Sequence, residues 1–165
     1  MVSFASRSGR CEREVLRQGH GTKITDADVK LLETFSEIET LDLRLTTIGD
    51  EGVAHLANLR KLKFLNLFRT NLSDKGLADL RGLVNLETLL IGGTKITDDG
   101  LKNIERFAKL RKLSVFGTAV SDAGLKSLEK LSSLEVLLIG ESKISETGAK
   151  SLQTKMPNLK FTEET

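Results

Sequence analysis

Apolar residues recur along the chain at a fixed interval of 24 residues. The interval is marked by residues that each open a similar stretch: Ile38, Leu62, Leu86, Leu110 and Leu134. Five such units run over residues 38–158, and a half unit over residues 14–37 precedes them. A repeat of about 20 to 50 residues is typical of proteins in which one structural unit is stacked many times.

The spacing of apolar residues differs between the first and the second half of each unit. In the third unit, Leu89 and Ile91 alternate with outward positions, which predicts a β-strand. Further along the same unit, Leu101, Ile104 and Phe107 recur every three residues, which predicts a helix with one buried face. The pattern therefore predicts a strand, a turn and a helix in every unit.

A helix-start signal separates the two halves. Thr97 is a candidate N-cap whose hydroxyl accepts a hydrogen bond from a free N–H, and Asp98 follows at the positive end of the helix dipole. A glycine then recurs, although glycine in a helix costs about 1 kcal/mol relative to alanine. We interpret its recurrence as a close approach between each helix start and the backbone of the neighbouring unit. The glycines are Gly52, Gly76, Gly100, Gly124 and Gly148.

One unit cannot bury its apolar face alone, so the units must stack. We predict an α/β fold, a right-handed solenoid with a parallel β-sheet on its concave face and helices on its convex face. Residues 14–165 are predicted to form one domain that ends with a strand in residues 159–165. Residues 1–13 share an Arg- and Ser-rich composition with transit peptides, but we interpret them as a tail or part of an N-terminal cap.

The repeated pattern LxxLxLxxTxITDxGLxxLxxL resembles the leucine-rich-repeat family over residues 22–161. The resemblance is to its short strand-plus-helix type, found in bacterial proteins, F-box substrate receptors and, with longer units, ribonuclease inhibitor. Threonine or serine stands where the family often has Asn or Cys, and a hydroxyl can form the same hydrogen bonds across the turn. The resemblance implies a horseshoe-shaped arc that serves as a scaffold for binding other proteins.

The charge balance and the residue types present limit the classes of function that the chain can have. The 165 residues include 25 basic and 23 acidic ones, a balance that offers no field to attract nucleic acid or a membrane surface. The one cysteine, Cys11, cannot form an intramolecular disulfide, which favours a cytoplasmic location. His20 and His55 belong to different units, and no metal-ligand cluster or phosphate loop is recognisable. We therefore expect no catalysis, no cofactor and no metal.

The residue after each opening apolar residue alternates in charge. Adjacent parallel strands lie about 4.8 Å apart, so opposite charges become neighbours along the stack. We interpret this ladder as a device for register and solubility rather than for recognition. Its members are Glu39, Lys63, Glu87, Arg111, Glu135 and Lys160.

Outward strand positions differ from unit to unit, and many are apolar. Exposed apolar patches often mark partner sites, and aromatic residues and arginine dominate the energetics of interfaces. An alternative is that Phe68 and Phe116 cover Gly92 and Gly140 on adjacent strands and so stiffen the sheet. We predict a protein-binding concave face formed by Arg44, Phe64, Phe68, Arg69, Leu90, Lys112, Phe116 and Leu138.

The sequence thus predicts a monomeric module that binds a protein or peptide partner. Two other functions remain open at this point. One is the substrate-recognition part of an F-box-type ubiquitin ligase or of a secreted effector. The other is a structural scaffold that self-associates.

Overall fold

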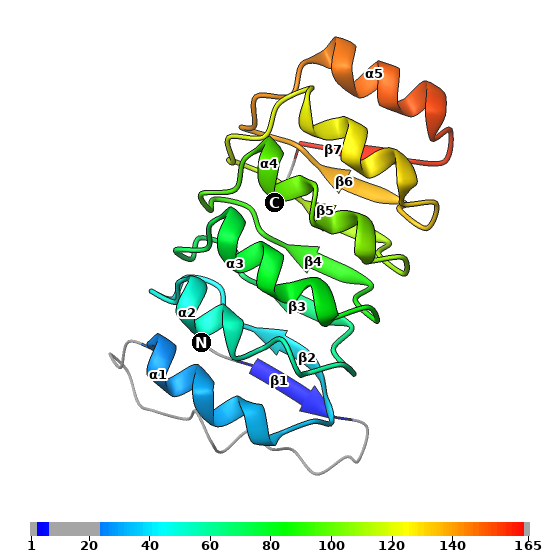
Figure 1. Ribbon diagram of the computed structural model, residues 1–165. Coiled ribbons are helices and arrows are strands. Elements are labelled where there is room, and N and C mark those ends of the chain that lie inside the picture. The colour runs from blue at the N-terminus through cyan, green and yellow to red at the C-terminus, as the bar shows by residue number, and fades with distance from the viewer. Residues whose placement is uncertain (1–2, 7–23, 164–165) are drawn as a thin grey trace.

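A computed structural model describes residues 3–6 and 24–163 of the chain. Its β-sheet contains parallel strands that stack in chain order (Figure 1). Each residue pairs with the residue one repeat further on, so that Leu65 lies between Leu41 and Leu89. This constant register follows from the constant repeat length. The parallel strands are β2 (Ile38–Asp42), β3 (Phe64–Asn66), β4 (Thr88–Leu90), β5 (Lys112–Ser114), β6 (Val136–Leu138) and β7 (Lys160–Thr162).

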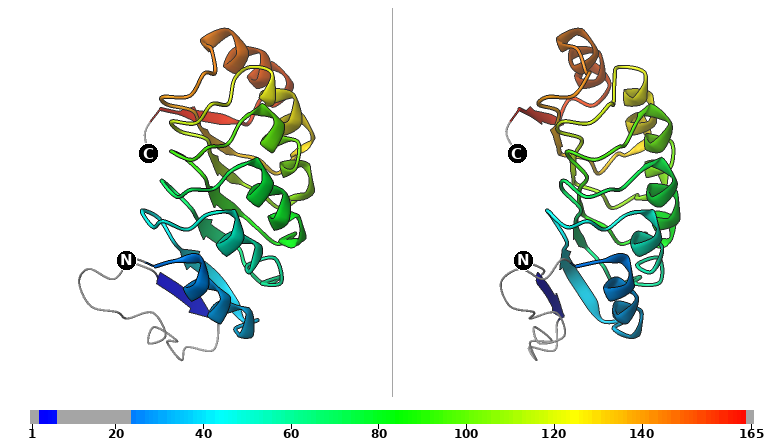
Figure 2. Two further views of the ribbon diagram at one scale, coloured as in Figure 1. Left: turned by 60° about the vertical axis from the view of Figure 1, so that its left-hand side comes forward. Right: turned by 90° about the vertical axis from the view of Figure 1, so that its left-hand side faces the viewer.

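Helices cover the opposite side of the repeats, and the whole stack curves toward the sheet (Figure 2). The sheet remains open and does not close into a barrel. These observations confirm the predicted α/β solenoid. The α-helices are α1 (Asp26–Val29), α2 (Asp50–Ala54), α3 (Asp74–Asp79), α4 (Asp98–Leu101) and α5 (Glu146–Lys155), and the 3-10 helices are η1 (Lys30–Thr34), η2 (Leu80–Gly82), η3 (Ile104–Arg106) and η4 (Gly124–Lys130).

In several repeats, much of the helical half is 3-10 helix. In the third repeat, Leu101 ends α4, Ile104 begins η3, and Phe107 is the C-cap residue of η3. All three side chains are fully buried. A 3-10 helix has three residues per turn, so positions i and i+3 lie on one side of it. The three-residue spacing in the sequence is therefore explained by the tighter helix.

The core is a set of apolar columns that run the length of the stack. Leu41, Leu65, Leu89, Leu113 and Leu137 form one such column, and none of them is exposed to solvent. Full burial of a leucine side chain contributes about 1.5–3 kcal/mol. Each repeat therefore depends on its neighbours for most of its stability.

Aspartates at the helix starts join adjacent repeats. Asp98 accepts a hydrogen bond from the backbone N–H of Ser121 at 2.7 Å and another from the Ser121 hydroxyl at 2.6 Å. The Ser121 hydroxyl also accepts from the N–H of Ala123 at 3.3 Å, in the turn that leads into η4. The same bonds from N–H and hydroxyl to the preceding aspartate link Asp50 to Ser73, Asp74 to Thr97 and Asp122 to Ser145.

The recurring glycines lie against these same aspartates. The atom nearest to a Cβ placed on Gly100 would be a carboxylate oxygen of Asp74, rather than the neighbouring backbone. In the first described repeat, Asp28 stands where the glycine recurs, and it accepts hydrogen bonds from the N–H and the hydroxyl of Thr25, both at 2.8 Å. These bonds lower the pKa of Asp28.

One strand of the sheet is not anticipated by the sequence pattern. β1 (Ser3–Ser6) pairs antiparallel with β2, with Phe4 opposite Leu41. Cys11 and His20 lie outside the described residues. The proposed division into residues 1–13 and 14–165 stays a prediction.

Candidate protein-binding face

The concave face is formed by strand side chains and by the turn that follows each strand. Each of these turns contains a residue with a left-handed backbone, with φ between 53° and 65°. The residue after it, threonine or serine, closes the turn; Thr70 donates its hydroxyl to the carbonyl of Leu67 at 2.8 Å. This confirms the predicted role of the hydroxyls. The left-handed residues are Leu45, Arg69, Gly93, Gly117 and Glu141.

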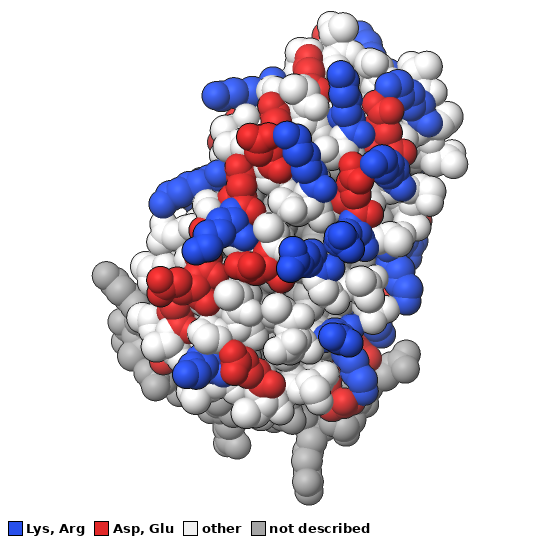
Figure 3. Space-filling model, viewed as in Figure 1, with Lys and Arg blue, Asp and Glu red and all other residues white. Residues whose placement is uncertain are grey.

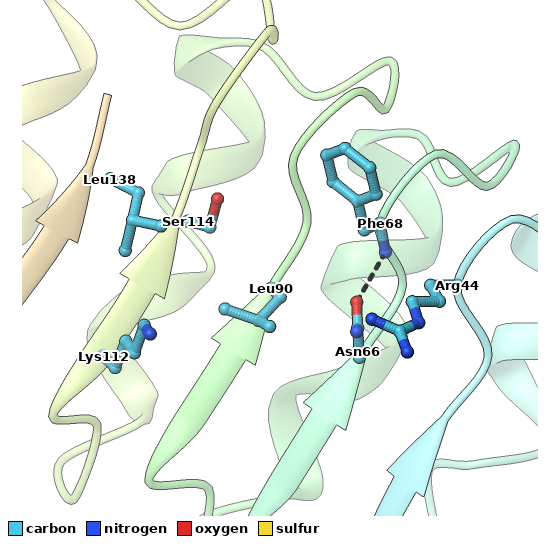
Figure 4. Close-up of a pocket in the computed structure, with 7 residues that line it drawn as sticks. All are labelled: Arg44, Asn66, Phe68, Leu90, Lys112, Ser114 and Leu138. Carbon is cyan, nitrogen blue, oxygen red and sulfur yellow. Dashed lines mark hydrogen bonds between the residues drawn. The ribbon is translucent and has the colours of Figure 1, made fainter. Parts of the chain in front are cut away.

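A pocket of about 200 Å³ opens in the middle of this face (Figure 4). Leu90 and Leu138 supply its apolar part, and Leu138 is only 5% exposed. Lys112 lies at the start of β5, whereas Phe68 lies beyond the end of β3. Five of the eight residues predicted for the binding face therefore meet around one pocket, whose lining is Arg44, Asn66, Phe68, Leu90, Lys112, Ser114 and Leu138.

Phe68 and Phe116 approach each other across Gly92. Their ring centroids are 6.4 Å apart, and the ring planes are inclined at 51°. A Cβ on Gly92 would lie 3.1 Å from a ring atom of Phe68 and 3.0 Å from the carbonyl oxygen of Phe116. The Phe68 ring therefore covers Gly92, and a ring atom of Phe116 would lie 3.0 Å from a Cβ on Gly140, as the stiffening hypothesis expects. Both phenylalanines nevertheless remain half-buried rather than buried.

The other three predicted residues, Phe64, Arg69 and Phe116, lie outside the pocket lining. The guanidinium carbon of Arg69 lies 5.2 Å from the centre of the Phe68 ring, a cation–π arrangement. Phe64 is half-buried in β3, where it pairs with Thr40 and Thr88. The assignment of the eight residues to a binding site stays a prediction.

The prediction left out Asn66 and Ser114, which line the pocket although both are buried. Asn66 accepts a hydrogen bond from the backbone N–H of Phe68 at 3.0 Å and so fixes the backbone that carries the ring. The sequence does place both polar residues at outward strand positions, and this was the signal that could have identified them as pocket residues. Its burial depends on neighbouring side chains, which the sequence pattern does not place.

The cations of the concave face differ in their pairing. Arg44 forms an ion pair with Asp42 at 3.3 Å. Among the residues that the structure describes, neither Arg69 nor Lys112 contacts a carboxylate, and both are exposed. Glu141 lies three strands from Arg69, a separation of about 14 Å.

Elsewhere, opposite charges neutralise each other across repeats. Lys63 pairs with Glu39 at 3.1 Å, and Arg111 with Glu135 at 3.0 Å, as the alternating ladder predicts. The Arg111 guanidinium lowers the pKa of Glu135, and the carboxylate raises the pKa of Arg111. Figure 3 shows the helix-bearing face, where acidic and basic side chains lie side by side along the stack.

On the helix side, His55 contacts Glu33 at 2.5 Å. Within residues 3–6 and 24–163, no three His, Cys, Asp or Glu side chains gather in a metal-binding arrangement. In the same part of the chain, no helix has the length and apolar character needed to cross a membrane.

Comparison with known proteins identifies the class. The sequence matches the family model described as Leucine Rich repeat over residues 38–57 and 58–80. The fold is similar to that of an internalin from Listeria monocytogenes, with a TM-score of 0.73 and 18% identity over 87% of this chain and 39% of that one. It is also similar to internalin C2 of the same organism, with a TM-score of 0.65 and 28% identity over 81% of this chain and 56% of that one.

The protein is thus a curved α/β solenoid, and two of its repeats, over residues 38–57 and 58–80, match the leucine-rich-repeat family model. No curated protein sequence matches it. The chain spans less than two thirds of either internalin. Solenoids of this kind usually present an extended concave surface for binding other proteins.

Proposed function

We propose that this chain is a non-catalytic protein-interaction module that binds a protein or peptide partner through its concave face. The pocket beside the Phe68–Phe116 pair carries the proposal. It combines an apolar floor with half-exposed aromatic rings and nearby cations, which are the residue types that dominate interface energetics. The eight residues predicted from the sequence supply most of this surface.

The rings are well placed to contact a partner at low entropic cost. Phe68 is held by Asn66 through its backbone and by Phe116 through its ring. A side chain that is already fixed loses little conformational freedom on binding. Covering Gly92 and contacting a partner are therefore compatible roles for the same ring.

The proposal includes a monomeric state and a cytoplasmic location. The charge ladder alternates in sign, and cations without a carboxylate neighbour among the described residues, such as Arg69 and Lys112, are few on the concave face. Nucleic acid binding relies on many phosphate contacts, so we do not expect a nucleic acid partner. Light scattering should give a mass that does not rise with protein concentration; a rising mass would support the self-associating scaffold instead.

An affinity capture from the source lysate tests the function. The wild type is compared with Phe68→Ser/Phe116→Ser and with Leu31→Ser/Val84→Ser, which alters two exposed apolar residues away from the pocket. Circular dichroism verifies that all three fold. We expect a partner to be captured by the wild type and by the second variant, and lost from the first. Equal capture by all three would contradict a concave site.

A further inference from the structure

The side chain of Arg69 is held in place without using the hydrogen-bond donors of its guanidinium. Its guanidinium lies over the Phe68 ring, and its side chain crosses Gly93, where a Cβ would lie only 2.7 Å from the Cγ of Arg69. The left-handed backbone of Arg69, with φ at 53°, directs the side chain onto this course. Within the described part of the chain, no acceptor meets the guanidinium.

Such an arrangement suits a carboxylate from outside the molecule. A guanidinium stacked on an aromatic face keeps the N–H groups at its edge available, and these match the two oxygens of a carboxylate. A left-handed backbone at a residue with a long side chain is unfavourable by about 1–2 kcal/mol, and such strain often marks functional sites. The equivalent positions in the other repeats are Leu45, Gly93, Gly117 and Glu141, so the fold itself does not require an arginine there.

Lys112 offers a second cation on the other side of the pocket. Its strand neighbours are Thr88 and Val136, which cannot neutralise it. Lys112 and Arg69 lie two strands apart, about 10 Å across the sheet and about 15 Å along it. An extended peptide covers that distance in about five or six residues. Leu90 and Leu138 lie in the pocket between these two sides.

From this geometry we infer that the concave face selects an acidic, apolar peptide segment. An apolar side chain enters the pocket at Leu90, one carboxylate binds Arg69, and a second carboxylate about five residues away binds Lys112. The inference rests on the proposed function and adds the chemistry of the partner. Arg69 and Lys112 determine specificity in this account, while Phe68 and Leu90 provide apolar contact.

Selection from a library of random 12-residue peptides displayed on phage tests the inference. The bait is the wild type, Arg69→Gln/Lys112→Gln, or the control Arg81→Gln/Lys126→Gln, which removes two exposed cations from the helix side. We expect peptides selected by the wild type and the control to be enriched in Asp and Glu near a Leu, Ile or Phe. Arg69→Gln/Lys112→Gln should retain the apolar preference and lose the acidic one.

A selected peptide, made synthetically, then gives the size of the effect. Its affinity should fall about tenfold or more in Arg69→Gln, because a charge-assisted hydrogen bond is lost, and should fall in Arg69→Lys as well. Equal affinity of Arg69→Gln and the wild type would overturn the inference. So would tight binding of a single-stranded DNA 12-mer that competes with the peptide.

Failure of the inference and failure of the proposed function give different results. If selected peptides lack acidic enrichment but lose binding to Phe68→Ser/Phe116→Ser, the inference is wrong and the concave site stands. If they bind Phe68→Ser/Phe116→Ser as tightly as the wild type, the concave site itself is wrong. Selection of no peptide by any bait contradicts both.

Discussion

Gly124 packs directly against the carboxylate of Asp98 in the preceding repeat. A Cβ on Gly124 would lie 2.5 Å from Oδ1 of Asp98, inside the van der Waals limit. The same oxygen accepts the backbone N–H of Ser121. Glycine at the helix start and aspartate in the neighbouring helix are therefore parts of one contact between repeats.

This contact predicts that Gly124→Ala is destabilising although alanine favours helices. Overpacking should lower the free energy of unfolding by about 1–3 kcal/mol, as measured by urea denaturation. Asp98→Ala alone should also be destabilising, because it leaves the Ser121 N–H without its partner. In the Asp98→Ala background, however, Gly124→Ala should cost little. Additive effects of the two substitutions would contradict the contact.

The left-handed turns predict a stabilising substitution. Leu45 has φ at 59° and is 66% exposed, so its side chain gains little from packing. Leu45→Gly should relieve backbone strain and raise the free energy of unfolding by about 0.5–1 kcal/mol, after the entropy of glycine is counted. Leu31→Gly, at an exposed leucine in the helical segment η1, should lower it. A loss of stability in Leu45→Gly would show that the turn is not strained.

Asp122 predicts a specific pH dependence. Hydrogen bonds from the hydroxyl and then the backbone N–H of Ser145 lower its pKa. The ionised carboxylate therefore stabilises the fold at neutral pH, and this stabilisation is lost as the pH falls through the lowered pKa. Ser145→Ala removes the larger cause, so the pKa of Asp122 should rise toward 3.8 in an NMR titration. Asp99, whose pKa is lowered by Lys102, serves as the unaffected control; an unchanged Asp122 would count against the bond.

Gly92 predicts a link between the sheet and the binding face. Gly92→Ala places a methyl group between Phe68 and Phe116, which should cost about 1–3 kcal/mol and displace the rings. Gly49→Ala is the matched control, because the nearest atom to its Cβ would be 3.7 Å away. Urea denaturation and the contacts between ring protons in NMR spectra measure the two effects. Equal stability of both variants would mean that the rings do not depend on the glycine.

The sequence predicted the solenoid because its signals are local and repeated. Leu89, Ile91 and Leu101 occupy positions that recur in every unit, so one unit explains all the others. The sequence did not predict the hydrogen bond from Ser121 to Asp98 in the preceding repeat. A sequence pattern indicates the local turn in which a residue lies, but not the residue's contacts with the adjacent repeat. The ladder from Glu39 to Glu135 was predicted because parallel strands in constant register bring equivalent positions together. The prediction was wrong for Lys160, which pairs with Val136 and so lies one position further along its strand than Glu135 does.

The candidate site was harder to predict than the fold. Outward strand positions identified Phe68, Leu90 and Lys112 as residues of one face, and the structure brings them to one pocket. The burial of Asn66 and Leu138 and the stacking of Arg69 depend on side-chain packing between strands. No periodic pattern encodes such packing, so the pocket itself required the structure.

Photo-crosslinking in the source lysate tests the concave binding site most directly. Benzoylphenylalanine is placed at Phe116, beside the pocket, or at Val84, an exposed position away from it. The account predicts that a partner crosslinks to the protein labelled at position 116 and not to the one labelled at position 84. A partner crosslinked only from position 84 would contradict a binding site on the concave face.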